Sequence, residues 1–233
     1  RLRAWGFNCL RFVFTWEALE HEGPGKYDHE YIQYTIRVRR RCKDFGFRVF
    51  MDPHQDVWSR FIGGLGAPSF WTLPACGLNS RNTTATHSAL LHFEQPEPIA
   101  YPAMVWGTNY ARFASQTLWT LFFAGRDYAP LCQIDGVNIQ DWLQRHYINA
   151  CGVLADTIRD AGDLHDSCII GWGSINESSE GYLGLRDLNL IPPHQSLKKP
   201  TCPTPVQGIR LASGIAQTVE NWAFGSLCPK RDG

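Results

Sequence analysis

An asparagine and a glutamate stand side by side at Asn176 and Glu177, directly after a run of apolar residues. The run, 168–172, reads C-I-I-G-W and is typical of a buried strand. A carboxyl group beside an amide at the exit of such a strand can exchange a proton with a bound substrate, because the strand fixes its position. Most glutamates are simply solvated, since charged side chains are mostly exposed. The pair therefore predicts acid–base chemistry only if other elements bring polar groups to the same edge.

Two earlier segments do end in polar residues at that edge. The apolar stretch 7–14, which carries Arg11, predicts a strand that is followed by Trp16 and Glu17 at its C-terminal end. The stretch 47–51 predicts a second strand, which runs into D-P-H-Q-D at 52–56. Because the carboxyl ends of parallel strands meet at one edge of a sheet, we expect the cluster 52–56 and Glu177 to face one cleft.

A helix is expected between these two strands, because Asp28 is a good N-cap and Gly46 is typical of the residue after a helix. Strand, helix and strand with short connections predict a right-handed βαβ unit. Apolar side chains recur at steps of three and four and predict the buried stripe of the helix: Tyr31, Thr35, Val38, Cys42 and Phe45. The basic side chains between them are expected on a solvated face: Arg37, Arg39, Arg40 and Lys43.

The remaining segments predict two further helices and two irregular regions. Apolar periodicity indicates helices over 109–123 and 138–161. Glycine and proline mark residues 59–108 as a long inserted loop, whose ends are expected to wall the cleft and whose part 79–97 is expected to be a mobile surface segment. Residues 185–233 are rich in proline and glycine and are expected to be irregular, with a short hairpin over 207–222.

Charge and cysteine content exclude some classes of protein. Lysine plus arginine and aspartate plus glutamate number 22 each, so the zero net charge predicts no nucleic-acid partner. No apolar run approaches the about 20 residues that span a bilayer. Eight cysteines without C-x-x-C spacing are interpreted as reduced thiols, with a disulfide framework as the less favoured alternative. Reduced thiols favour a cytoplasmic location, although the chain starts at Arg1 and its true N-terminus is expected to be missing.

Taken in order, the three strand-end motifs resemble glycoside hydrolase family 5. A-W-G-F-N-C-L-R-F-V-F-T-W-E at 4–17 resembles the signature of the second barrel strand, and D-P-H-Q-D-V-W-S-R-F at 52–61 that of the third. G-W-G-S-I-N-E at 171–177 resembles the fourth. W-G-T-N-Y, L-F-F-A-G-R-D-Y-A-P and N-I-Q-D-W-L-Q resemble one fungal branch, which holds glucosylceramidases and steryl-β-glucosidases related to endoglycoceramidases.

The resemblance implies an α/β fold, namely a partial (β/α)8 TIM barrel with strands two to four, so that 1–233 is an incomplete barrel domain. It implies a retaining β-glucosidase that acts on a sterol glucoside or glucosylceramide, with Glu177 as general acid/base. It implies no cofactor or metal, and transient membrane contact through the lipid substrate. The implied sugar-binding residues are Arg11, His54, Asp56, Trp106 and Asn176. Ser178 departs from the family pattern, which has proline after the glutamate.

Retaining hydrolysis needs a second carboxylate as nucleophile, about 5–5.5 Å from the first. In this family it follows the seventh strand, and we expect it to lie beyond residue 233. The other carboxylates considered lack the family position, and Asp56 is the best placed of them: Glu17, Asp52, Asp56, Glu180 and Glu220. The chain alone is therefore expected to be inactive.

Two alternatives remain open. The missing nucleophile would also suit a non-catalytic barrel remnant or a sugar-binding fragment, and the next about 200 residues of the gene product would decide between this and an enzyme. A metal-dependent hydrolase built on His54, His87 and His92 is less favoured, because their spacing fits no common zinc pattern.

Overall fold

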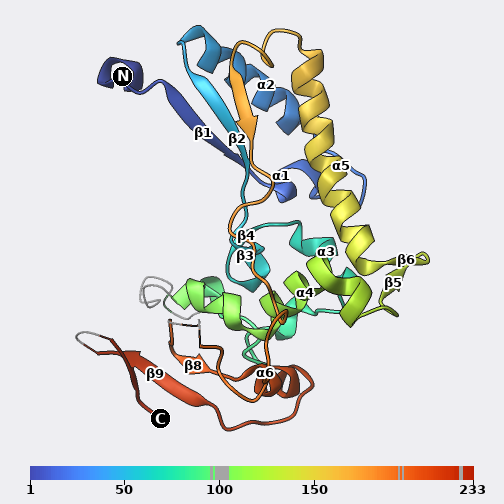
Figure 1. The fold of residues 1–233 in the computed structure, drawn as a ribbon, viewed down its shortest axis with the longest axis vertical. Coiled ribbons are helices and arrows are strands. Elements are labelled where there is room, and N and C mark those ends of the chain that lie inside the picture. Colours follow the sequence, from blue (N-terminus) through green and yellow to red (C-terminus); the bar gives the residue numbers. More distant parts are fainter. Residues whose placement is uncertain (95–96, 98–104, 194, 196, 226–227) are drawn as a thin grey trace.

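The computed structural model describes residues 1–94, 97, 105–193, 195, 197–225 and 228–233. Three parallel strands form its main sheet in the order β1 (Cys9–Phe14), β2 (Arg48–Pro53) and β7 (Ile169–Trp172). In Figure 1 these strands lie side by side in the upper part of the molecule, with the helices α2 (His29–Asp44) and α5 (Ile139–Asp160) beside them. The predicted strands and their parallel βαβ connection are thus confirmed.

The register of the sheet brings the three strand ends together. Leu10 pairs with Val49, and Val49 pairs with Ile169, so β2 lies between the other two strands. Gly173 then continues alongside β2 by donating to the Met51 carbonyl at 2.9 Å. The loop after β7 therefore begins beside the polar residues that end β2.

Helix α2 begins where the sequence predicts, but it is rotated about its axis relative to the prediction. The Asp28 side chain accepts a hydrogen bond from the Tyr31 N–H at 2.7 Å. Phe45, predicted to be buried, is 60% exposed, and Arg39, predicted to be solvated, is fully buried. The buried face consists of Ile32, Thr35, Ile36 and Arg39.

Arg39 explains this difference. Its guanidinium lies over the Phe12 ring, and its Nη1 lies 3.5 Å from the Met51 sulfur. Such stacking lets a long basic side chain cover apolar surface. A prediction that counts every arginine as polar and exposed therefore misses it. Burial lowers the Arg39 pKa to about 10.

The segment predicted to be a long inserted loop contains short regular elements that pack into the core. β3 (Val57–Trp58) immediately precedes this segment. Within it lie η2 (Arg60–Ile62), β4 (Leu65–Gly66), α3 (Ser69–Ala75), η3 (Ser80–Asn82) and η4 (His92–Glu94), and η6 (Val105–Ala111) extends past its end at residue 108. Ala89 and Leu91 are almost fully buried, which argues against a purely surface location for 79–97. Residues 95–96 of that segment lie outside the described part of the chain.

Next come α4 (Phe113–Tyr128), which bends at Ala124, and the short strands β5 (Gln133–Ile134) and β6 (Val137–Asn138) that lead into α5. Five tryptophans, one each from α1 (Trp16–Glu20), β3, α3, α4 and α5, pack in edge-to-face contacts: Trp16, Trp58, Trp71, Trp119 and Trp142. Beside them Glu20, in the short helix α1, is fully buried. Its carboxylate accepts from the Trp16 indole at 2.6 Å and lies 3.1 Å from His146 Nδ1.

The hairpin predicted over 207–222 is wrong. Residues 205–212 form the helix α6 (Pro205–Ala212), because Thr204 and Gln207 make a capping box and Pro205 occupies the first turn, where proline is tolerated. The strands β8 (Thr201–Cys202), β9 (Glu220–Phe224) and β10 (Pro229–Arg231) form a small antiparallel sheet next to it. In Figure 1 this layer lies below the helices α3 and α4.

Candidate active site

The site lies where β1, β2 and β7 end, and one arginine joins the three. Arg11 Nη2 donates to Asp52 Oδ2 at 2.8 Å and to Asn176 Oδ1 at 2.6 Å. Arg11 is on β1, Asp52 is in β2, and Asn176 is four residues beyond β7. The Asp52 side chain is buried while Arg11 remains half exposed on the open side of the sheet. The Arg11–Asp52 ion pair therefore holds together the strand ends from which Asn176 and Glu177 project.

His54 and Asp56 extend this network away from Arg11. His54 Nδ1 approaches Asp52 Oδ2 at 3.4 Å, and His54 Nε2 lies 3.1 Å from Asp56 Oδ2. All three side chains are largely buried. The hydrogen bond between Nε2 and Asp56 holds the imidazole, and the approach of Nδ1 to Asp52 is an electrostatic contact rather than a hydrogen bond. Of the predicted site residues, the structure thus brings together Arg11, His54, Asp56 and Asn176.

The segment after Asp56 is under backbone strain. Val57 has a φ of 62° and Trp58 a φ of 121°, values that β-branched and bulky residues rarely adopt. The pairing of β3 with β4 holds this conformation, with Asp56 and Leu65 exchanging hydrogen bonds at 2.8 and 2.9 Å. Strain of this kind persists only where surrounding contacts over-determine it, and it is concentrated at functional sites.

Two glycines make the tight pairing of β3 and β4 possible. A Cβ atom on Gly64 would lie 1.8 Å from the Asp56 carbonyl oxygen, and one on Gly66 would lie 2.2 Å from Gln55 Cβ. The glycines that marked an irregular loop in the sequence therefore allow the close approach of two backbones.

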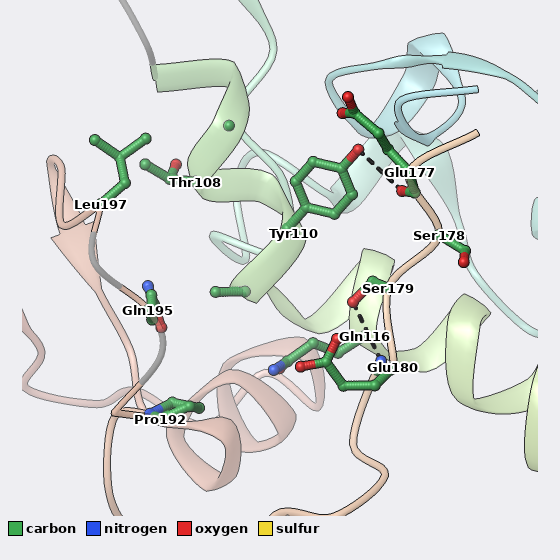
Figure 2. A pocket seen from close by; sticks show the side chains of 13 residues that line it. Thr108, Tyr110, Gln116, Glu177, Ser178, Ser179, Glu180, Pro192, Gln195 and Leu197 are labelled. Carbon is green, nitrogen blue, oxygen red and sulfur yellow. Dashed lines mark hydrogen bonds between the residues drawn. The ribbon is translucent and has the colours of Figure 1, made fainter. Parts of the chain in front are cut away.

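Glu177 lies at the edge of a cavity of about 360 Å³, which is large enough for a small ligand. Figure 2 shows this cavity between the loop after β7, the element η6 and the segment that leads to β8. Its lining includes Thr108, Tyr110, Gln116, Glu177, Glu180 and Leu197. In the figure the Glu177 carboxylate points away from Glu180, so the structure does not pair these two carboxylates.

Two tyrosines hold the loop that carries Glu177. The Tyr110 hydroxyl donates to the Glu177 carbonyl at 3.3 Å, a bond drawn in Figure 2. The Tyr147 hydroxyl, which comes from α5, donates to the Ser174 carbonyl at 2.5 Å. Burial raises the pKa of both tyrosines, and the nearby Asp56 and Glu177 carboxylates add to the shift of Tyr110. Both hydroxyls therefore stay protonated as hydrogen-bond donors around neutral pH.

The structure places the other predicted residues as follows. Trp106 lies in η6 and is 42% exposed, but it is not among the residues that line the Glu177 cavity. Glu17 pairs with Arg60 at 3.1 Å, and Glu220 pairs with Arg231 in the small sheet.

The histidines proposed for a metal do not form a cluster. His87 lies near Thr201 and Arg112, whereas His54 lies between Asp52 and Asp56. Over the part of the chain that the structure describes, no group of three or more His, Cys, Asp or Glu side chains could hold a metal ion. The same residues include no helix long and apolar enough to cross a bilayer.

Sequence reasoning missed three residues that shape the site. Tyr147 was visible only as an apolar position on a helix, and Tyr110 only as part of a motif. Gln55 belongs to the polar cluster 52–56, but the sequence pattern assigned it no role. Their contacts join residues 27, 67 and 121 positions apart in the sequence, for Tyr147, Tyr110 and Gln55 respectively, and no local pattern predicts such contacts.

Comparison with known proteins finds relatives of this chain. Residues 1–89 match the family model described as cellulase (glycosyl hydrolase family 5). The chain is related to glycoside hydrolase family 5. Its three parallel strands are accordingly part of a (β/α)8 barrel, as the motifs predicted.

Individual relatives match the chain over 95–100% of its length. It is 52% identical over 233 residues to a glucosylceramidase of Aspergillus fumigatus, covering 100% of the chain and 31% of the relative. It is 44% identical over 236 residues to the ergosteryl-beta-glucosidase of Saccharomyces cerevisiae, covering 95% of the chain and 31% of the relative. The crystal structure of Cryptococcus neoformans sterylglucosidase 1 matches with a TM-score of 0.95 and 58% identity, covering 100% of the chain and 33% of that protein. The chain thus spans about a third of the length of these relatives.

Proposed function

We propose that residues 1–233 supply the acid/base side of the active site of a retaining β-glucosidase that acts on glucosylated lipids. One observation carries the proposal. Arg11 fixes the Asn176 amide at the meeting point of three parallel strand ends, and the next residue, Glu177, faces a cavity. This is the edge at which barrel enzymes place their catalytic groups.

In this proposal Glu177 protonates the glycosidic oxygen as the lipid alcohol leaves, and then removes a proton from the attacking water. Asn176 holds a sugar hydroxyl through its amide, whose orientation Arg11 fixes. His54 and Asp56 contact the sugar ring from the end of β2, and Trp106 contacts it from η6. The carboxylate that attacks the anomeric carbon comes from a part of the full-length protein outside residues 1–233.

The names of the relatives support the substrate class. They include a glucosylceramidase and an ergosteryl-beta-glucosidase, whose substrates both join glucose to a lipid alcohol. A glucosylated lipid is therefore the proposed substrate, and its residence in a bilayer implies transient membrane contact. A cytoplasmic location stays a prediction from the cysteine content.

The experiment uses the full-length protein that carries this chain. Glu177→Ala is expected to slow hydrolysis of an alkyl or steryl glucoside by about 10²–10⁴-fold, the usual contribution of a general acid. A dinitrophenyl glucoside, whose leaving group needs no proton, is expected to form the glycosyl-enzyme still, and added azide should then release β-glucosyl azide. Glu180→Gln, a change in the same cavity, serves as the control and should keep activity within a few-fold of wild type.

Two outcomes would contradict the proposal. One is full activity of Glu177→Ala on the alkyl glucoside. The other is hydrolysis of an aryl glucoside by the purified 233-residue chain, because the chain would then hold its own nucleophile.

A further inference from the structure

We propose that Gln55 is a positioning residue for Glu177, which it acts on through hydrogen bonds to Asn176. This inference rests on the proposed function of Glu177. It concerns how the carboxylate is aimed, and Gln55 itself is not among the residues that line the Glu177 cavity.

Gln55 and Asn176 exchange hydrogen bonds. The Gln55 side-chain amide donates to the Asn176 carbonyl, and the Asn176 side-chain amide donates to the Gln55 carbonyl at 2.9 Å. The Asn176 N–H also donates to the Pro53 carbonyl at 3.3 Å. The loop after β7 is thereby tied to the end of β2 at both the backbone and the side chain of one residue.

These contacts fix the direction of the Asn176 amide. Its oxygen accepts from Arg11 and its nitrogen donates to Gln55, so rotating the amide by half a turn would lose both bonds. The residue that precedes Glu177 therefore has a single arrangement, and Gln55 makes two of the bonds that define it.

Glu177 needs such support because its own side chain has none. It has a φ of 40°, in the left-handed region that non-glycine residues rarely occupy. Glu177 is exposed at the edge of the cavity, and within the described residues no hydrogen bond or ion pair reaches its carboxylate. The backbone therefore sets the Cα–Cβ direction from which the carboxylate projects, and this backbone is held at the Asn176 carbonyl by Gln55 and at the Glu177 carbonyl by Tyr110.

Gln55 is well suited to this role because it cannot easily move. Its side chain is 6% exposed, and the Gly66 backbone packs so closely that a Cβ there would lie 2.2 Å from Gln55 Cβ. It precedes the strained residues Val57 and Trp58, which β4 holds in place. The strained loop thus acts as a rigid support for Gln55, and Gln55 transmits its position to the acid/base loop.

The test compares Gln55→Met with Gln144→Met in the full-length protein. Methionine keeps the approximate volume of glutamine but removes the donor. Gln144 is a matched control, since its side-chain amide also donates to a backbone carbonyl, that of Phe122 at 2.6 Å, on a different element. If the Glu177 carboxylate is misplaced by about 1 Å, kcat should fall about 10- to 100-fold for an alkyl glucoside, whose departure needs a proton.

Substrates with different leaving groups distinguish a misplaced Glu177 carboxylate from a general loss of activity. Gln55→Met should lower the rate at which a dinitrophenyl glucoside forms the glycosyl-enzyme by less than about 3-fold, because that step needs no proton donor. KM for the alkyl glucoside should change little, and Gln144→Met should resemble wild type with both substrates. Should Gln55→Met fail to fold, Gln55→Glu keeps one acceptor oxygen and the side-chain length and should show the same selective loss.

The inference is overturned if the Gln55 variants slow the glycosylation step equally for both substrates, or slow neither. It is also overturned if Gln144→Met shows the same selective loss. These results are distinct from a failure of the proposed function, in which Glu177→Ala itself would keep its activity on the alkyl glucoside.

Discussion

Arg11 donates a hydrogen bond to the Asn176 side-chain oxygen at 2.6 Å, although the two residues are 165 positions apart. The same guanidinium nitrogen binds the buried Asp52 carboxylate at 2.8 Å. One side chain on β1 thus fixes both the residue before Glu177 and the carboxylate that begins the network at the end of β2. This relationship makes Arg11 the first residue to test.

Arg11→Met should lower kcat/KM for a glucoside by about 10- to 100-fold in the full-length protein, because charged hydrogen bonds are worth about 1.5–3 kcal/mol. The loss follows from release of the Asn176 amide and from leaving Asp52 without its cation. Steady-state kinetics on an alkyl glucoside measures the effect. Arg41→Met, which removes an exposed arginine paired with Asp44, is the control and should leave kcat/KM unchanged. Equal kcat/KM values for Arg11→Met and Arg41→Met would show that Arg11 does not contribute to the site.

Gly64→Ala should destabilise the protein by about 1–3 kcal/mol or more, because the new Cβ would lie 1.8 Å from the Asp56 carbonyl oxygen. The change must push β3 and β4 apart and should lower activity as well, since Asp56 and His54 move with them. Gly152→Ala is the matched control: no atom lies within 4 Å of its added Cβ, and Gly152 is within the helix α5. That variant should gain about 0.5–1 kcal/mol. Thermal unfolding measures both, and a stable Gly64→Ala protein would contradict the β3–β4 geometry.

The cysteines should differ sharply in reactivity, since all eight are free thiols in the structure. Burial raises the Cys151 pKa to about 12, so at pH 8 only about one molecule in ten thousand carries a thiolate there. Because the thiolate is the reactive form, Cys151 should resist alkylation at that pH. The rate of Cys151 alkylation should rise steadily as the pH approaches 12. Cys9 and Cys228 are exposed and should react first. Mass spectrometry after brief treatment with iodoacetamide measures the order. Rapid labelling of Cys151 in the folded protein would contradict the packing around Tyr147.

The sequence predicted the main sheet well because its signals are local. Asp28 caps α2 as expected, and the apolar runs around Arg11 and before Asn176 became β1 and β7. The meeting of the strand ends followed from the general behaviour of parallel sheets. Four predicted site residues accordingly fall into one network.

What the sequence did not predict depends on packing. Arg39 is buried because it can stack on Phe12, and that contact depends on how α2 rotates against the sheet. The prediction of an irregular tail with a hairpin over 207–222 rested on its proline and glycine content, whereas Pro205 at the first turn of α6 helps a helix begin. The role proposed for Gln55 depends on its hydrogen bond to Asn176, a residue 121 positions away in the sequence. Each case is decided by a tertiary contact rather than by a local preference.

The placement of β7 beside β2 also has a consequence for the order of folding. β1, α2 and β2 are contiguous in the sequence and can assemble early, whereas β7, the strand that precedes the Glu177 loop, pairs with β2 across about 120 residues. Contacts of such long range form slowly, because the closing of a long loop has to come first. During synthesis the chain therefore exposes one edge of β2 until residues 169–172 have emerged. The loop that carries Glu177 is then the last piece of this region to dock, and a nascent chain stalled before it would present an open strand edge to chaperones.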